Sequence, residues 1–383
     1  MKIVIYTYFM HQGTERLMPW RTLVEVAKTI NNTQGLEAII VSSSNINIEK
    51  IREYQSIEIV EIPKGIKSFN SFFKENVFDV IYYPISWRDG LKSMSFLNNL
   101  KYNKIAYITG GVYNFKGVMS LFKTVGFSVS KSYFLELITP KSLITKKLIS
   151  NGFKKVITFS NYTGRFAEKS GWNKEQVIVS LPGKDNFNQL ITNQELLIRN
   201  NLLNKKFYLF MGAPAEARGS IQLLKAFDLF ARRNPNALLV FLLRTDNHSN
   251  FSSFFENYNN LKSKNQILIL RDKLSPSDLK SYVESARAVI LPFLIIPSEI
   301  PLTYFEVLSC GVPIITYKNG GTYDYLKNCL LACSPGSIKG LSELMNKMWS
   351  NDIIHDKLSK SSLELMEKHP DWESSSLEWI KAI

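Results

Sequence analysis

The stretch AVILPFLIIPSEIPLTYFEVLSCGVPIITYKNGG, residues 288–321, decides the fold. It begins with an apolar run typical of a strand, AVILPF, continues into a helical segment, TYFEVLSCG, and ends in a second strand-like run, PIITYKN. Two apolar strands joined by one helix form the repeating unit of a parallel sheet that helices cover on both faces. The stretch therefore predicts an α/β fold, with acids, prolines and a glycine pair placed at the strand ends.

The same alternation extends through the rest of the chain. Strand-like runs occur in two series, separated by the polar segment that follows residue 185: KIVIYTY, LEAIIVSS, FDVIYYPIS, KIAYITG, KKVITFS and EQVIVSLPGKD before it, and FYLFMGA, ALLVFLLR and QILILRD after it. We expect two doubly wound, Rossmann-like domains, over residues 1–190 and 200–368, and a terminal helix over residues 369–383. A cleft between two such domains is a usual place for a ligand.

Composition restricts the class of protein. The chain has 383 residues, of which 45% are apolar and 21% charged, which is the balance of a globular protein. No run reaches the roughly 18 apolar residues of a membrane-spanning helix, and MKIVIYTYFM reads as a buried first strand rather than a signal sequence. Three cysteines without metal-ligand spacing indicate reduced thiols in the cytoplasm, and four scattered histidines predict no metal site.

The basic charge is unevenly distributed. Residues 1–185 contain 25 basic and 14 acidic side chains, and within residues 90–160 there are 11 basic residues and one acid, Glu136. Aromatic residues are interspersed with these lysines, a combination that favours an anionic lipid surface. A solvated lysine-rich face is the alternative interpretation. A nucleic-acid surface would need a recognition motif, and the sequence contains none.

Polar residues follow three strands of the second domain, where ligands of parallel sheets bind. Arg218 and Gly219 follow FYLFMG and suit a diphosphate, because arginine binds phosphate bidentately and glycine allows close backbone approach. Glu306 lies in the helix that Pro301 opens, where a carboxylate can accept hydrogen bonds from vicinal hydroxyls. Gly320, Gly321 and Thr322 form a second candidate anion loop. Each residue alone is more often structural, so the prediction of a nucleotide-sugar site rests on their joint placement.

On these motifs the chain resembles the retaining GT-B glycosyltransferases of the "glycosyl transferases group 1" class, which is family 4-like. EVLSCGVPII resembles the second half of the family's acid-x7-acid motif, FMGAPAEARGSIQLLKAF its Gly-Arg…Lys-Gly segment, and VITFSNYTGRFAEKSGWNKEQVIVSLPGKD the segment that closes its first domain. HPDWESSS resembles its final helix. Three positions depart from the pattern: Ser298 stands eight residues before Glu306 with Glu299 one residue later, Ala213 replaces the arginine, and Thr109 replaces a histidine.

The resemblance implies a GT-B fold in which the terminal helix crosses back to the first domain, and catalysis without cofactor or metal. It implies that Arg218 and Glu299 are catalytic, with either Glu299 or Ser298 replacing the first family acid. The donor would be bound by Gly212, Gly219, Ser298, Leu302, Thr303, Glu306, Gly320, Gly321 and Thr322. The first loop and acceptor side would contain Gly13, Thr14, Thr109 and Gly110.

The sequence thus predicts a hexosyl-type glycosyltransferase that moves a sugar, with retention, from a nucleotide-diphosphate sugar to a lipid-linked or cell-surface glycan acceptor. We expect it to act in the cytoplasm, peripherally on the inner membrane face, through Lys116, Lys123, Lys146, Lys147, Lys154 and Lys155. The alternatives are a soluble glycosyltransferase acting on a free sugar or polysaccharide, and a catalytically degenerate nucleotide-sugar-binding protein.

Overall fold

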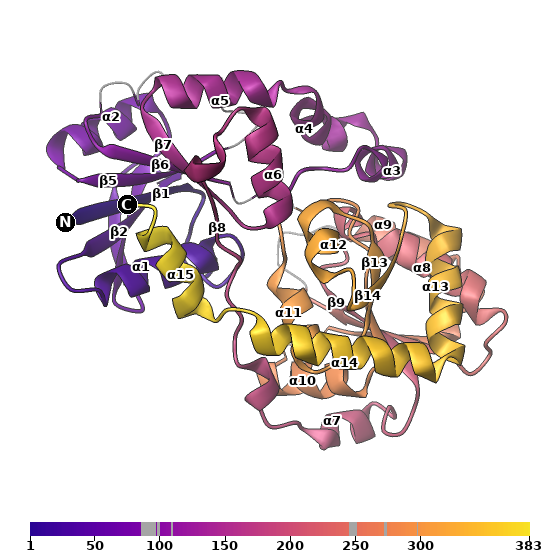
Figure 1. Ribbon diagram of the computed structural model, residues 1–383. Helices are drawn as coiled ribbons and strands as arrows, with labels where there is room; N and C mark the ends of the chain where they lie inside the picture. Colours follow the sequence, from indigo (N-terminus) through magenta and orange to yellow (C-terminus); the bar gives the residue numbers. More distant parts are fainter. Residues whose placement is uncertain (86–96, 98–99, 109, 245–250, 272–273, 297) are drawn as a thin grey trace.

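The computed structural model describes residues 1–85, 97, 100–108, 110–244, 251–271, 274–296 and 298–383. It contains two sheets, one in the N-terminal half and one in the C-terminal half, with helices packed around each (Figure 1). The α/β fold with two parallel-sheet, Rossmann-like halves is therefore confirmed.

The N-terminal sheet has the strand order β3-β4-β2-β1-β5-β6-β7-β8, and its named pairs are parallel except for β3 with β4. Its strands are β1 Lys2–Tyr8, β2 Glu37–Ser44, β3 Lys50–Tyr54, β4 Ile57–Pro63, β5 Val80–Pro84, β6 Asn103–Ile108, β7 Phe153–Thr158 and β8 Val177–Val179. The accompanying helices are α1 Trp20–Asn31, α2 Ile66–Glu75, α3 Phe115–Val125, α4 Phe127–Ile138, α5 Lys141–Ser150 and α6 Asn161–Ser170.

The C-terminal sheet has the order β11-β10-β9-β12-β13-β14, with all of its named pairs parallel. Its strands are β9 Phe207–Gly212, β10 Leu238–Leu243, β11 Ile267–Leu270, β12 Ala288–Leu291, β13 Ile314–Tyr317 and β14 Leu330–Cys333. The helices are α7 Gln194–Arg199, α8 Ser220–Ala231, α9 Ser252–Asn259, α10 Pro276–Ser285, α11 Leu302–Ser309, α12 Gly320–Leu326, α13 Ile338–Ser350 and α14 Asp352–Lys368. Short 3-10 turns are η2 Lys174–Gln176, η3 Phe187–Gln189, η4 Glu216–Arg218 and η5 Lys264–Gln266.

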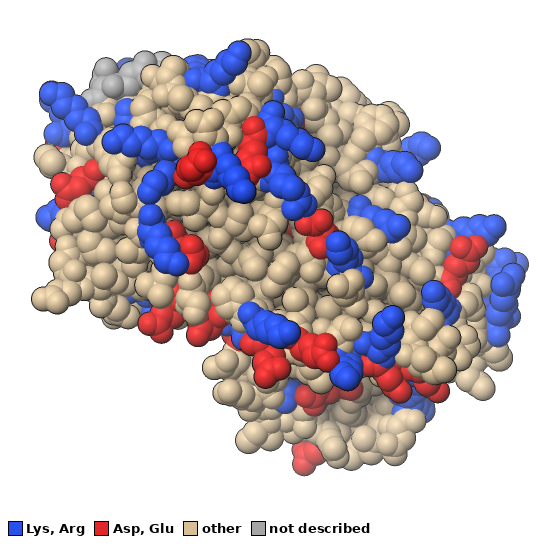
Figure 2. All heavy atoms as spheres, viewed as in Figure 1, with Lys and Arg blue, Asp and Glu red and all other residues tan. Residues whose placement is uncertain are grey.

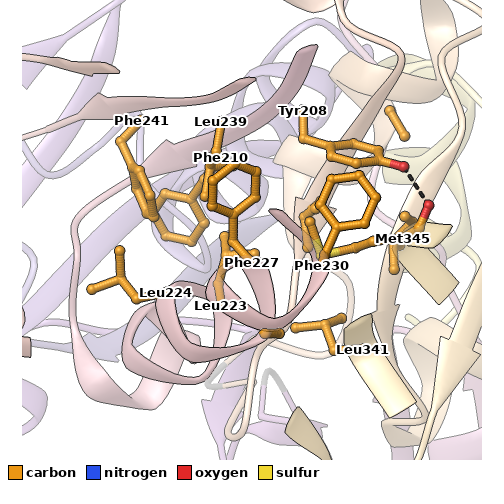
Figure 3. Close-up of a cluster of buried hydrophobic side chains, with 14 of the residues drawn as sticks. Tyr208, Phe210, Leu223, Leu224, Phe227, Phe230, Leu239, Phe241, Leu341 and Met345 are labelled. Atoms are coloured by element: carbon orange, nitrogen blue, oxygen red, sulfur yellow. Dashed lines mark hydrogen bonds between the residues drawn. The ribbon is translucent and has the colours of Figure 1, made fainter. Parts of the chain in front are cut away.

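An aromatic core holds the C-terminal sheet to its covering helices. Phe210 and Phe241 extend from neighbouring strands toward Phe227 of α8, and all three are fully buried (Figure 3). Tyr208 lies in the same cluster, where its hydroxyl donates to the carbonyl oxygen of Met345 at 2.6 Å. Burying each such ring contributes on the order of 2–3 kcal/mol, so this cluster holds β9 and β10 against their covering helices.

The last helix, α15 Trp372–Ile380, leaves the C-terminal half and packs beside α1 of the N-terminal half (Figure 1). Trp379 is fully buried there, and the Tyr82 hydroxyl donates to its carbonyl oxygen at 2.6 Å. The expected crossing of the terminal helix back to the first domain is thus confirmed.

Candidate functional site

Loops from the carboxyl ends of β6, β12 and β13 meet in a narrow cleft between the two halves of the molecule. Its lining residues are Gly111, Val112, Tyr113, Asn114, Leu294, Ile295, Ile296, Glu299, Asn319, Gly320, Gly321 and Thr322. The first four come from the N-terminal half and the rest from the C-terminal half. The cleft therefore lies at the strand ends where parallel sheets bind their ligands.

Glu299 is the central charged residue of this cleft, and its side chain is only 2% exposed. Its Oε1 accepts a hydrogen bond from the Ser160 hydroxyl at 2.6 Å, and its backbone carbonyl accepts one from the Thr322 hydroxyl at 2.7 Å. Its Oε2 is buried and has no hydrogen-bond partner among the described residues. Burial raises the pKa of Glu299 above its ordinary value, while the hydrogen bond from Ser160 opposes that rise. A buried, unpartnered carboxylate oxygen is costly unless a ligand donates to it.

Two glycines enclose the carboxylate of Glu299. A Cβ at Gly321 would lie 1.8 Å from Oε1, and one at Gly111 would lie 3.0 Å from Oε2. Any larger residue at position 321 would therefore displace the acid. Gly321 is therefore required because the acid packs directly on the start of α12.

Arg218 lies in a second cluster at the carboxyl end of β9. Its guanidinium carbon is 5.3 Å from the centre of the Phe293 ring, a cation–π distance. A Cβ at Gly212 would meet the Arg218 Nη1 at 2.4 Å, and one at Gly219 would meet the Pro292 carbonyl oxygen at 1.9 Å. The Asn319 amide donates to the carbonyl oxygen of Phe293, which ties this cluster to the loop that precedes α12. The predicted residues Gly212, Arg218 and Gly219 are thus brought together.

Glu306 faces a different environment, in the middle of α11. It is half-buried, and its pKa is raised to about 7. Burial is the main cause, the charge of Asp185 adds to the rise, and the charge of Arg244 opposes it. Asp185 lies in the segment that leads into the C-terminal half. As predicted, Pro301 directly precedes the helix, and Leu302 and Thr303 form its half-buried first turn.

The remaining predicted residues are distributed less compactly. Ser298 is buried beside Glu299, and its Oγ has no hydrogen-bond partner among the described residues. Gly110 directly precedes the cleft residue Gly111, whereas Thr109 lies outside the described residues. Gly13 is exposed with a φ of 90°, and Thr14 bonds to His11 of the same loop at 2.7 Å. Neither Gly13 nor Thr14 belongs to the described lining of the cleft.

The contacts of His369, at the crossover between the two halves, were not predicted from the sequence. His369 is 3% exposed and packs against Phe305 of α11, with ring centres 4.1 Å apart and ring planes tilted by 39°. It bonds to the Tyr325 hydroxyl and the Pro182 carbonyl oxygen. Burial lowers its pKa to about 4, so the neutral ring donates to the carbonyl and accepts from the tyrosine. One histidine thus connects the crossover to α11 and α12, the two helices that begin at the cleft.

The six predicted basic residues lie on three elements of the N-terminal half. Lys116 and Lys123 belong to α3, Lys146 and Lys147 to α5, and Lys154 and Lys155 to β7, where the Lys155 ammonium donates to the carbonyl oxygen of Lys381. Figure 2 shows basic and uncharged surface, without acids, in the region of α3 and α4.

Helix α4 has an unusually exposed apolar surface. Ser130 is the one buried residue of α4, whereas Phe127 and Val129 are each 57% exposed and Ile138 is 75% exposed. These exposed apolar side chains make α4 a candidate interaction site.

The described residues contain no group of three or more His, Cys, Asp or Glu side chains arranged to hold a metal ion. Metal-free catalysis therefore stays a prediction. In the same part of the chain, no helix has both the length and the apolar character needed to cross a bilayer.

Known proteins resemble this chain in both sequence and fold. Residues 193–364 match the family described as glycosyl transferases group 1, while no curated protein sequence matches. Sucrose-phosphate synthase from Thermosynechococcus elongatus has 12% identity and a TM-score of 0.73, with 99% of this chain and 97% of that one covered. HepE from Anabaena in complex with UDP has 12% identity and a TM-score of 0.71, with 100% and 99% covered.

The α,α-trehalose 6-phosphate synthase from Burkholderia multivorans, at 8% identity, has a TM-score of 0.70 over 99% of this chain and 97% of that one. At such low identities these structures establish the fold alone, and the family match is confined to the C-terminal half. Residues 193–364 thus match the glycosyl transferases group 1 family, and the whole chain has the GT-B fold.

Proposed function

We propose that this enzyme transfers a sugar from a nucleotide-diphosphate sugar, held mainly by the C-terminal half, to a hydroxyl of a lipid-linked or cell-surface glycan. The observation that carries this proposal is the buried carboxylate of Glu299, whose Oε2 is unpartnered among the described residues at a cleft lined by glycines. A sugar hydroxyl is a neutral donor of the kind that such an oxygen accepts. In this proposal Glu299, rather than Ser298, contacts the transferred sugar.

The diphosphate has three sources of positive potential around it. Arg218 supplies a fixed positive charge, the first turn of α11 at Leu302 and Thr303 supplies backbone N–H groups, and the Gly320–Thr322 turn supplies a further set. These groups stabilise the charge that develops on the leaving diphosphate. Removal of one such contact costs on the order of 3 kcal/mol in transition-state stabilisation, which is about a hundred-fold in rate.

Glu306 is proposed to accept hydrogen bonds from the ribose hydroxyls of the donor. Its raised pKa means that the empty site holds this acid partly protonated near neutral pH. Hydrogen bonds from two hydroxyls favour the ionised form, so donor binding near pH 7 releases a proton. The presence of UDP in the HepE complex makes uridine nucleotides the first probes to try.

Retention of the anomeric configuration forms part of the proposal. Glu299 and Tyr113 are the titratable side chains among the described residues that line the cleft, and Glu299 is engaged by Ser160. The acceptor hydroxyl would attack on the face from which the diphosphate leaves, and its proton would pass to a phosphate oxygen. The anomeric coupling constant of the product, measured by NMR, tests this step: the donor's configuration is expected, and the opposite one contradicts it.

The donor is identified by thermal unfolding with a panel of nucleoside diphosphates and nucleotide sugars. A ligand present at 100 times its Kd stabilises the folded state by about 2.7 kcal/mol, which is a shift of several degrees. We expect one nucleotide to produce this shift in the wild type and not in Glu306→Ala. Absence of a shift with every nucleotide and nucleotide sugar would contradict the donor proposal.

The acceptor side is proposed to meet an anionic membrane through the surface of α3, α4 and α5. Here exposed apolar residues of α4 lie among the lysines of α3 and α5, and the described surface of α4 carries a single acid, Glu136. Apolar side chains that enter the headgroup region, surrounded by lysines, are the arrangement by which peripheral proteins bind anionic lipid. This surface would place the enzyme on the cytoplasmic membrane face, next to a lipid-linked acceptor.

Vesicle sedimentation tests the membrane surface. Lys116→Gln with Lys146→Gln should reduce binding to vesicles with 30% anionic lipid by about 30-fold, since each of the two lysines contributes about 1 kcal/mol. Phe127→Ser with Ile138→Ser should also reduce binding, because it removes apolar side chains that enter the headgroup region. Lys154→Gln on β7 is the matched control, and it should bind like the wild type. If the α4 and lysine variants bind as tightly as the wild type, the acceptor is instead a free sugar or polysaccharide.

A further inference from the structure

The contact between Glu299 and Ser160 joins the two halves of the molecule. Ser160 follows β7 in the N-terminal half and caps α6, where its Oγ accepts from the Thr163 N–H at 3.1 Å. Glu299 follows β12 in the C-terminal half. Both side chains are at most 2% exposed, so their 2.6 Å hydrogen bond is shielded from water. A hydrogen bond to a carboxylate in such a place is worth more than an exposed one.

This contact determines which oxygen of Glu299 remains for a ligand. Ser160 engages Oε1, and a Cβ at Gly321, in the same half as Glu299, would lie 1.8 Å from that oxygen. Oε2 is left facing Gly111, buried and without a partner among the described residues. With one oxygen fixed, the carboxylate plane cannot rotate freely, and the second oxygen has a defined direction.

We infer that Ser160 is a positioning residue for Glu299, so that the acid reaches its sugar-binding orientation only when the two halves close. This inference rests on the proposed donor site. Because the serine and the acid come from different halves, opening the cleft breaks their hydrogen bond and frees the carboxylate. The enzyme would then bind the nucleotide part of the donor in either state and the sugar part only in the closed state.

The test compares the affinities for UDP and UDP-glucose by calorimetry. In Ser160→Ala we expect UDP to bind within about two-fold of the wild type and UDP-glucose to bind about ten-fold more weakly, as the loss of one charge-assisted hydrogen bond implies. Ser160→Thr keeps the hydroxyl and should restore the preference for UDP-glucose. If Ser160 had only a structural role, Ser160→Ala would weaken the binding of UDP and of UDP-glucose to the same extent.

A double-mutant cycle separates the contact with Glu299 from the capping of α6. Ser160→Ala combined with Glu299→Gln should bind UDP-glucose no more weakly than Glu299→Gln alone, because the carboxylate that Ser160 positions is already absent there. Thr124→Val is the matched control: it removes another hydroxyl contact between the halves, the 3.0 Å bond from the Gln222 amide, and should leave the UDP-glucose preference unchanged. If the effects of Ser160→Ala and Glu299→Gln on the Kd for UDP-glucose multiply in the double variant, the inference is overturned.

A measurement without ligand tests this inference independently of the donor proposal. If the wild type binds neither probe, uridine donors are excluded. Thermal unfolding of the wild type, Ser160→Ala, Glu299→Gln and the double variant then tests whether the two side chains are coupled. Non-additive losses of stability in Ser160→Ala and Glu299→Gln support the coupling, whereas additive losses overturn it.

Discussion

Replacement of Glu306 by glutamine should stabilise this protein at alkaline pH while it weakens donor binding. The carboxyl group is half-buried in α11, and its pKa is raised to about 7. Because this folded-state value lies above the unfolded one, the group favours the folded state fully below about pH 4.5 and loses that contribution as pH rises through 7. Glutamine has nearly the same shape and never becomes charged.

The size of the effect follows from the shift in pKa. A rise from 4.5 to about 7 is worth about 3 kcal/mol at pH 8 and only a few tenths at pH 4, at 1.4 kcal/mol per unit. For a chain of this length the alkaline gain corresponds to an increase in Tm of about 4 °C. The gain should shrink steadily as the pH is lowered.

Thermal unfolding of wild type and Glu306→Gln at pH 4, 6 and 8 measures this difference directly. Glu343→Gln is the control, because Glu343 is a 65% exposed acid on α13 whose ion pair with Lys339 contributes little. Equal Tm values for wild type and Glu306→Gln at pH 8, or a loss of stability there, would refute the argument that burial destabilises the charged form. The same variant should also bind nucleotide more weakly at pH 8, where the wild-type acid is ionised.

Three further predictions concern other parts of the fold. Because the folded-state pKa of His369 lies near 4, below its unfolded value, stability should fall by about 2 kcal/mol between pH 7.5 and pH 5, and His369→Gln should abolish this loss in urea titrations. A Cβ at Gly183 would lie 2.5 Å from the Trp372 Cα, so Gly183→Ala should lower the free energy of unfolding by roughly 2 kcal/mol, measured by denaturant unfolding; a neutral effect would contradict the close approach. Phe227→Ala should cost about 3–5 kcal/mol by calorimetry, whereas Leu229→Ala on the exposed side of α8 should cost less than 1.

Much of the fold was predictable because buried parallel strands are continuous apolar runs. The hairpin of β3 and β4 was missed, although IEIVEI carries a strand pattern. Its turn uses Gln55 and Ser56 with φ values of 52° and 64°, positions where asparagine and glycine are the usual indicators. Because this turn lacks those residues, the edge strand β3 was not predicted.

The candidate site was only partly predictable. Motif spacing identified the loops that carry Arg218, Glu299 and the Gly320–Gly321 pair, because each follows an apolar strand. Sequence could not show that Glu299 bonds to a serine from the other half, because that contact joins residues 139 positions apart. One indication was available: Ser160 is an N-cap residue directly after a strand, which places it at the carboxyl edge of the sheet.

Hydrogen–deuterium exchange with and without the stabilising nucleotide sugar tests the central claim most directly. The account predicts slower exchange in peptides from residues 212–220 and 298–322, and in the α6 start around residue 160, with no change in the pocket between α7 and α10. Protection confined to that second pocket, or to the first loop around Gly13, would contradict a donor site built on Glu299, Arg218 and the glycine turn.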